Sequence, residues 1–421
     1  MKHLVFIDAN NSAIQCMDEA LNMGYKVSFI QQEDITVYQV NEFSNTILRR
    51  VNNIINVNNA TDENELIIIL SKILEKESID GVIASNEPTL EAVSAACKKC
   101  GIFFTNPQGV KNARNKFYAR EILRKCGIAT VNSWVANSME EARKIFEENT
   151  PPFIFKPVSG FDSLHAFKVE SLAQLDDVAD EILSAAKINE VQYADIFSRG
   201  ILVEEFIHGK LLSAEVAFYD EKFTPLMISG RSQSKFNECI ELGSLMPADV
   251  SEEEKLLCFQ YAEDVCRALG LNHGIFHIEL MYTKRGPILV EANPRLMGGV
   301  MPEIYKQSTG FSIYPNLFNI YANANSDVSI YPSIKAVTVR KIIPVYDGYL
   351  SDKFDISDLK NHPNIVNFYS DKITPQRKIG KNEVLGRIMV AHADLDNATE
   401  IADNILNEIG KRIGIELHTP C

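Results

Sequence analysis

The chain has 421 residues, of which 46% are hydrophobic and 23% charged, and its formal net charge is −14. This length exceeds one typical core and predicts two to four domains of an ordinary globular protein. The acidic balance argues against a general nucleic-acid binder, and no apolar run approaches the roughly 18–20 residues that cross a bilayer. We therefore expect small-molecule partners, no nucleic acid, no membrane and a cytoplasmic location. A homodimer is the default expectation from symmetry statistics.

Eight cysteines are scattered along the chain, which predicts free thiols in a reducing compartment. Cys97 and Cys100 form a C-x-x-C pair at the end of a helical stretch. No second pair completes a zinc site, so a redox or metal role for this pair is not favoured.

The first hundred residues alternate strand and helix signals. Strands are expected at 3–7, 26–30 and 80–85, and helices at 12–24, 61–79 and 88–101, the second of these with Thr61 as its N-cap. This rhythm predicts a parallel sheet with crossover helices. The first turn, "DANNSA", contains no glycine, so the fingerprint of a dinucleotide-binding site is missing.

A second unit is expected to begin near Asn106–Pro107 with one helix over 110–127. Strands at 129–136, 152–158, 200–207 and 211–220 follow, with helices at 138–149 and 171–187. Ser251 and Glu254 form a capping box that opens a helix ending at Gly270. The last portion predicts a hairpin over 274–293, strands at 336–343 and 383–393, and a helix over 397–414.

The stretch "VEANPRLMGG" places an acid, an amide and a guanidinium two residues apart, at Glu291, Asn293 and Arg295. In an extended strand these three side chains share one face. Ordinary edge strands also alternate, so this pattern alone leaves a purely structural role equally open.

The preceding strand of the expected hairpin, "GIFHIELMY", places His277 and Glu279 on one face. If the polar faces of the two strands agree, Glu279, Glu291 and Asn293 converge as hard oxygen ligands suited to Mg²⁺. Two carboxylates held close repel unless a cation lies between them. The alternative is a solvated hairpin face, and His277 is either a substrate contact or a hydrogen-bonded structural histidine.

Two lysines are candidates for phosphate contacts. Lys156 closes an apolar strand and is followed by the small-residue loop Ser159–Ser163, and Lys116 lies on the helix that opens the second unit. A lysine at a strand end beside such a loop suits a phosphate. Taken singly, each lysine fits an ordinary surface position better than a phosphate site.

The order of these motifs resembles the ATP-grasp superfamily, whose members activate a carboxylate as an acyl-phosphate. It runs from Lys116 through Lys156-Pro157, Glu204–Ile207 and Glu279 to Glu291-x-Asn293-x-Arg295. The resemblance implies an α/β (α+β) fold with an N-terminal Rossmann-like pre-ATP-grasp domain, a central lid subdomain and a C-terminal mixed α+β domain. The expected ranges are 1–107, 108–212 with the lid at about 130–205, 213–332, and a C-terminal extension at 333–421.

Within that superfamily the chain is most similar to the L-amino-acid ligases, which form dipeptides. "ECIELGSLMPADV" resembles their E-x-G-x-x-x-P segment through Glu241, Gly243 and Pro247, and the tail from Ala336 to Leu417 resembles their C-terminal extension. Ser244 stands where that group commonly has a histidine. The loop Ser159–Ser163 has one glycine where many relatives have several.

The resemblance implies a role for each matched residue. ATP and Mg²⁺, or Mn²⁺, are the expected cofactors, and the metal ligands are Glu279, Glu291 and Asn293. Contacts to the nucleotide are implied for Lys116, Lys156, Ser163, Glu204, Glu205, Phe206, Ile207 and, near the ribose, Glu215. Catalytic roles are implied for Arg295, Glu241 and Lys156, and substrate contacts for Glu87, Ser244, His277 and Gly298.

The expected function is therefore an ATP-dependent carboxylate–amine ligase that joins amino-acid-like substrates and releases ADP and phosphate. A carboxylase-like or purine-pathway ATP-grasp enzyme is the second possibility. A nucleotide-binding regulatory protein that has lost catalysis is the third, and the presence of Glu279, Glu291, Asn293, Lys156 and Arg295 opposes it.

Overall fold

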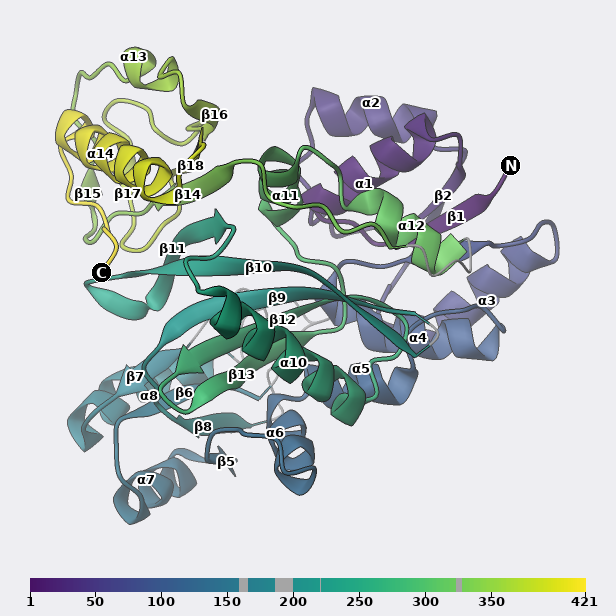
Figure 1. The fold of residues 1–421 in the computed structure, drawn as a ribbon, viewed down its shortest axis with the longest axis horizontal. Helices are drawn as coiled ribbons and strands as arrows, with labels where there is room; N and C mark the ends of the chain where they lie inside the picture. The colour runs from purple at the N-terminus through teal and green to yellow at the C-terminus, as the bar shows by residue number, and fades with distance from the viewer. Residues whose placement is uncertain (159–165, 186–199, 220, 323–327) are drawn as a thin grey trace.

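The structure is a computed structural model that describes residues 1–158, 166–185, 200–219, 221–322 and 328–421. Ser163, a predicted nucleotide contact, lies outside the described residues. Within these ranges the strands form four sheets, and the helices cover the sheet faces (Figure 1). The mixture of helices and strands confirms the predicted α/β class.

The N-terminal unit is built on a parallel sheet of strand order β3-β2-β1-β4. The parallel sheet confirms the prediction, although β3 and α2 were not foreseen. The helix α3 begins after Asp62, whose side chain accepts hydrogen bonds from Asn64 and Glu65, so the prediction of Thr61 as N-cap was wrong. The elements are β1 (His3–Ile7), α1 (Asn11–Asn22), β2 (Lys26–Gln32), α2 (Glu42–Arg50), β3 (Asn53–Val57), α3 (Glu63–Leu74), β4 (Gly81–Ile83), the 3₁₀ turn η1 (Glu87–Thr89) and α4 (Leu90–Lys99).

Two helices stand where the sequence predicted one. The chain leaves helical geometry at Asn115, and the Asn115 side chain accepts a hydrogen bond from the Tyr118 amide, which caps the second helix. The single helix over 110–127 was therefore wrong, because an asparagine that caps a new helix start competes with helix continuation. The two helices are α5 (Pro107–Arg114) and α6 (Lys116–Lys125).

A small sheet of order β5-β8-β6-β7 follows, at the lower edge of Figure 1. Its strands pair antiparallel, and Phe153 and Phe155 fill the core beneath α7. The elements are β5 (Ser133–Ala136), α7 (Met139–Glu148), β6 (Phe153–Pro157), β7 (Phe167–Val169), α8 (Leu172–Ala185) and β8 (Ile201–Glu205).

The central sheet has eight strands in the order β13-β12-β9-β10-β11-β14-β18-β16. The long hairpin β10–β11 was not predicted. The predicted capping box at Ser251 and the predicted end of α10 at Gly270 are both confirmed, and Gly270 has a left-handed conformation. The elements are β9 (Lys210–Tyr219), β10 (Lys222–Ser234), β11 (Asn237–Met246), α10 (Glu252–Leu269), β12 (Gly274–Thr283), β13 (Gly286–Asn293), α11 (Met301–Thr309), α12 (Tyr314–Ala322), β14 (Ala336–Ile342), β16 (Ile365–Tyr369) and β18 (Gly386–His392).

The two faces of this sheet belong to different cores. The helix α10 packs on one face against residues such as Val216 and Phe276. On the other face, Tyr305 of α11 and Phe318 of α12 pack together with α1 and β1 of the N-terminal unit and with β14 and β18. One apolar core is therefore shared by the N-terminal unit, the central sheet and the C-terminal part of the chain. The division of the chain at 107, 212 and 332 stays a prediction.

The C-terminal part adds its own core around α14, which packs on β14 and β18. The remaining elements are β15 (Gly348–Tyr349), α13 (Ser357–Lys360), β17 (Lys378–Ile379) and α14 (Leu395–Ile413). Among the residues described, none of the helices has the length and apolar character needed to traverse a lipid bilayer. All eight cysteines have free thiols, as the sequence predicted.

Candidate nucleotide and substrate site

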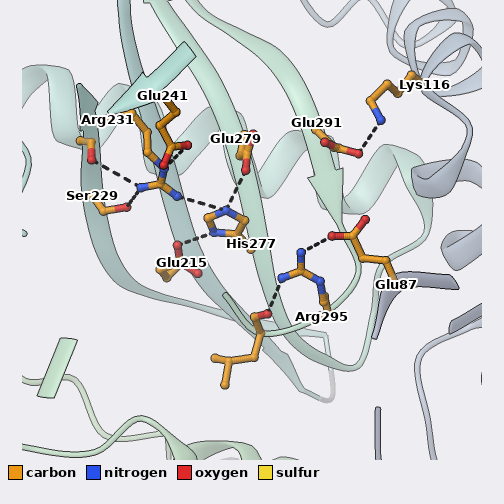
Figure 2. A network of polar contacts seen from close by, with 12 residues as sticks. Glu87, Lys116, Glu215, Ser229, Arg231, Glu241, His277, Glu279, Glu291 and Arg295 are labelled. Carbon is orange, nitrogen blue, oxygen red and sulfur yellow. Dashed lines mark hydrogen bonds and ion pairs between the residues drawn. The ribbon is translucent and has the colours of Figure 1, made fainter. Parts of the chain in front are cut away.

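The hairpin β12–β13 brings the predicted metal ligands together. Glu279 pairs directly with Glu291 across the hairpin, and His277 pairs with Asn293. A bulge follows Glu279 and shifts the register of the remaining strand. Figure 2 shows His277, Glu279 and Glu291 projecting from neighbouring strands toward one face. The geometry therefore supplies two carboxylates and one amide on adjacent strands, as the alternation of the sequence predicted.

His277 lies between two carboxylates and orients one of them. Its Nδ1 lies 2.6 Å from Glu215 Oε1, and its Nε2 lies 3.0 Å from Glu279 Oε1 (Figure 2). Burial lowers the pKa of His277, but the two carboxylates outweigh that effect and raise it to about 9. At neutral pH the ring is therefore an imidazolium that donates from both nitrogens. Burial raises the pKa of Glu279, whereas the His277 hydrogen bond and charge lower it to about 2, so Glu279 is ionised.

Glu291 is held by a predicted phosphate-binding residue. Lys116 Nζ donates to Glu291 Oε1 over 2.6 Å, and this ammonium is 9% exposed. The oxygens of Glu279, Glu291 and Asn293 fit Mg²⁺, which prefers hard oxygen donors and leaves positions for phosphate and water. Within the described ranges, no three His, Cys, Asp or Glu side chains stand together as a complete metal cluster.

A buried ion triad lies at the end of β8. Glu204 accepts from Lys156 Nζ over 2.6 Å and from Arg120 Nε over 2.9 Å. Burial raises the pKa of Glu204, but the two cations outweigh it and lower the pKa. One carboxylate therefore serves two buried cations, and the Nη1 of Arg120 has no partner among the described residues. This excess of positive charge suits a phosphate-bearing ligand.

Arg295 reaches across to the N-terminal unit. Its guanidinium pairs with Glu87 on the 3₁₀ turn after β4, and Arg114 Nη1 donates to the other Glu87 oxygen over 2.7 Å. Burial raises the pKa of Glu87, but the charges of Arg295 and Arg114 outweigh burial and lower the pKa below its ordinary value, so the carboxylate stays charged. A side chain on Gly298 would lie about 3.2 Å from the Arg295 guanidinium, so this glycine leaves room beside it. Arg295 also borders a small cavity of about 20 Å³.

A third group of charges surrounds Glu241 on β11. Arg231 Nε lies 3.3 Å from Glu241 Oε2, and Lys341 Nζ of β14 donates to Glu241 Oε1 over 3.2 Å. Arg231 Nη2 also lies 3.3 Å from His277 Nε2, an approach of two donors that places this group beside the metal-ligand hairpin (Figure 2). Ser244 is buried opposite Arg231 across the β10–β11 pairing.

The other predicted nucleotide contacts lie around the end of β8. Glu205 pairs with Arg285, and Phe206 packs on His208 and under Lys168. Ile207 follows at the half-buried exit from the strand. Glu215 is completely buried, so this conformation presents none of its oxygens to a ribose, and its ribose role stays a prediction.

Four cations at this site were missed by the sequence reasoning: Arg114, Arg120, Arg231 and Lys341. Arg114 ends α5 and Arg120 lies on α6, close in sequence to the predicted phosphate contact Lys116. Only their spacing from Lys116 could have indicated them. Arg231 lies on a strand that was not predicted. Lys341 lies on a predicted strand, but its pairing with β11 could not be read from the sequence.

Comparison with known proteins agrees with this geometry. A family model described as "ATP-grasp domain" matches residues 149–303, and one described as "ATP-grasp N-terminal domain" matches residues 17–102. Together these matches cover more than half of the chain. The chain belongs to the ATP-grasp superfamily.

Curated relatives and solved structures add detail to this ATP-grasp assignment. The chain is 25% identical to alanine–anticapsin ligase of Bacillus subtilis (strain 168) over 259 residues, which is 58% of this chain and 54% of that protein. It is 26% identical to dapdiamide A synthase of Enterobacter agglomerans over 246 residues, 57% of this chain and 56% of that protein. The chain thus spans just over half the length of these curated relatives.

The L-amino acid ligase of Bacillus licheniformis has the same fold. Its structure matches with a TM-score of 0.75 at 22% identity, covering 97% of this chain and 98% of that one. An N5-carboxyaminoimidazole ribonucleotide synthetase in its ADP complex matches with a TM-score of 0.71 at 15% identity, covering 97% and 98%. These likenesses confirm the predicted ATP-grasp fold.

Proposed function

We propose that this ATP-grasp protein is an ATP-dependent carboxylate–amine ligase. It joins the carboxylate of one amino-acid-like substrate to the amine of another through an acyl-phosphate, and it releases ADP and phosphate. The observation that carries this proposal is the pairing of Glu279 with Glu291 beside the buried cations Lys116 and Arg295. Two relatives whose names describe a ligase and a synthase support the amide-forming chemistry.

The nucleotide is held by the cations and by the end of β8. Lys116 and Lys156 contact phosphate oxygens, and residues 204–207 meet the adenine largely through backbone groups. Lys156 suits this task because burial, together with Arg120 and Lys116, lowers its pKa against the opposing effect of Glu204. An added phosphate relieves that excess of positive charge.

Arg295 and the residues of the proposed metal site act on the transferring group. Glu279, Glu291 and Asn293 would hold Mg²⁺, which, when bound, would supply charge neutralisation at the phosphate oxygens. Arg295 faces the same region and neutralises charge on the phosphoryl group that passes to the carboxylate. Phosphoryl transfer depends mainly on positioning and charge neutralisation. This chain must therefore supply a ring of fixed cations around the phosphoryl group.

The substrates meet the polar groups beside this ring. Glu241 receives the α-ammonium of the amino acid whose carboxylate is activated, and Glu87 and Gly298 border Arg295 on the side of the N-terminal unit. Ser244 and His277 line the floor between them. The acceptor amine enters from the exposed edge of this group.

The test is a phosphate-release screen over pairs of amino acids and small carboxylates, with mass detection of the product. The expected result is release of ADP and phosphate only when a carboxylate and an amine are both present, together with an amide product. AMP and pyrophosphate would refute the acyl-phosphate route. Bicarbonate-dependent ATP hydrolysis without an amino acid would instead favour a carboxylase-like enzyme, and nucleotide binding without turnover would favour a regulatory protein.

A further inference from the structure

The strand β14 approaches the site so closely because one residue of β11 has no side chain. A Cβ on Gly243 would lie 2.0 Å from the carbonyl oxygen of Val339, and Gly243 has a φ of +154°. Just beyond this contact, β11 and β14 pair antiparallel, with Leu245 opposite Thr338. Glycine is thus required for the passage of β14 beside the strand that carries Glu241.

The alternation of β14 then aims one lysine at the site. Val337 and Val339 point into the core that β14 shares with α11 and the N-terminal unit. Arg340 points the other way, where it donates to Asp403 of α14 and to the hydroxyl of Ser232 on β10. Since side chains two apart share a face, Lys341 emerges on the side of Val337 and Val339, at the edge of their core.

Lys341 contacts Glu241 at this edge, and the Glu241 carboxylate stays partly exposed. The ammonium donates to Oε1 over 3.2 Å, while Arg231 lies against Oε2. Glu241 is 29% exposed and Lys341 26% exposed, whereas Arg231 is 5% exposed. A carboxylate has about four acceptor positions, so two cations can orient it and leave positions for a third donor.

We propose that Lys341, supplied by the C-terminal extension, is a positioning residue that holds the Glu241 carboxylate in place for the α-ammonium of the amino-acid substrate. This inference rests on the proposed function, and it deepens that function by assigning the extension a part in recognising α-amino acids. Two effects oppose each other: Lys341 orients Glu241, and its charge repels an incoming ammonium. Orientation dominates because Lys341 engages one oxygen and leaves the exposed lone pairs of the carboxylate open.

The experiment measures binding directly, apart from turnover. The twenty amino acids are first screened by thermal shift against the full chain with Mg²⁺ and ADP. Calorimetry then gives the Kd of the amino acid with the largest shift, and of the same acid without its α-amino group, for wild type and Lys341→Met. The amino-acid Kd should rise about tenfold in Lys341→Met, while the Kd values of ADP and of the des-amino acid stay within about twofold.

Matched variants separate positioning from loss of structure. Lys341→Arg should restore most of the affinity, and Lys372→Met, on an exposed lysine of the same C-terminal part, should leave it unchanged. In a Glu241→Gln background, Lys341→Met should add almost nothing, because the two residues act on one contact.

Several outcomes overturn the inference. The first is tighter binding of the amino acid by Lys341→Met than by the wild type. The second is an equal loss of affinity for the amino acid and for its des-amino analogue. The third is that none of the twenty amino acids shifts the melting temperature of the wild type. If the wild type forms no amide but binds the amino acid with the expected dependence on Lys341, the proposed ligase function fails while the positioning role stands.

Discussion

Replacing Glu87 with glutamine tests how much the ion pairs of Glu87 with Arg114 and Arg295 stabilise the contact between the N-terminal unit and the site. The Glu87 carboxylate is 8% exposed and lies between the guanidinium groups of Arg114, 4% exposed, and Arg295, 13% exposed. Glu87→Gln keeps the shape and one acceptor but removes the carboxylate charge that pairs with both arginines, while Glu279 and Glu291 still act on Arg295. Removing one partner of a buried pair costs about 3–5 kcal/mol. Because Arg295 retains some solvent contact and the amide still accepts one hydrogen bond, we expect a loss of about 3 kcal/mol.

The pH dependence of that loss gives a sharper test. The two arginines hold the pKa of Glu87 below 4.5, its ordinary value, against the opposing effect of burial. The stabilisation is therefore fully present above that ordinary value, and it is lost as pH falls through the lowered pKa of the folded state. Urea unfolding followed by circular dichroism should show a constant gap between wild type and Glu87→Gln above about pH 5. The gap should narrow in more acidic solution.

The control is Glu75→Gln, because Glu75 is an exposed carboxylate of the same unit. It should change the free energy of unfolding by less than about 0.5 kcal/mol at every pH. A loss below about 1 kcal/mol for Glu87→Gln, or a gap that does not narrow at low pH, would refute the reasoning, since either shows that the charge of Glu87 is not what holds the two arginines.

Three further predictions follow from other contacts. Arg295→Met should lower kcat/KM for ligation by about 10³-fold while ADP affinity changes little, and a loss below about tenfold would remove Arg295 from the phosphoryl-transfer role. Gly243→Ala should cost about 3 kcal/mol in urea unfolding, because its Cβ meets the Val339 carbonyl at a positive φ, whereas Gly348→Ala, where nothing lies within 4 Å, should be nearly neutral. Burial lowers the pKa of His273 to about 4, so the folded state binds fewer protons and loses stability as pH falls from about 6.5 to about 4. His273→Phe should reduce that loss by about 3 kcal/mol, as urea unfolding at pH 7 and pH 4 would show.

The metal-ligand hairpin could be predicted because its information is local. The alternation of "GIFHIELMY" and "GPILVEAN" and the short turn between them set both the pairing and the faces, so Glu279 and Glu291 were expected to meet. The capping box at Ser251 is equally local. By contrast, the break at Asn115 depends on a single cap in an otherwise continuous helical pattern.

The charge partners could not be predicted because they join distant segments. Glu87 meets an arginine 208 positions further along the chain, and Glu241 meets a lysine 100 positions away. Such pairs depend on strand order, which a two-residue period does not encode. The β10–β11 hairpin was missed as well, and without it neither Arg231 nor the approach of β14 could be placed.

The shared core of α1, α11, β14 and β18 has a consequence for how members of this fold can exchange parts. Val337 and Met389 lie in the same apolar cluster as Phe6 and Met17, in which α11 packs against β11 and β14 while α12 packs against α1. A chimera that takes its tail from a relative, joined near residue 332, inherits a mismatched surface against β11 and α11. Exchange of substrate preference by tail replacement therefore requires the matching faces of β11 and α11 to be transferred together with the tail.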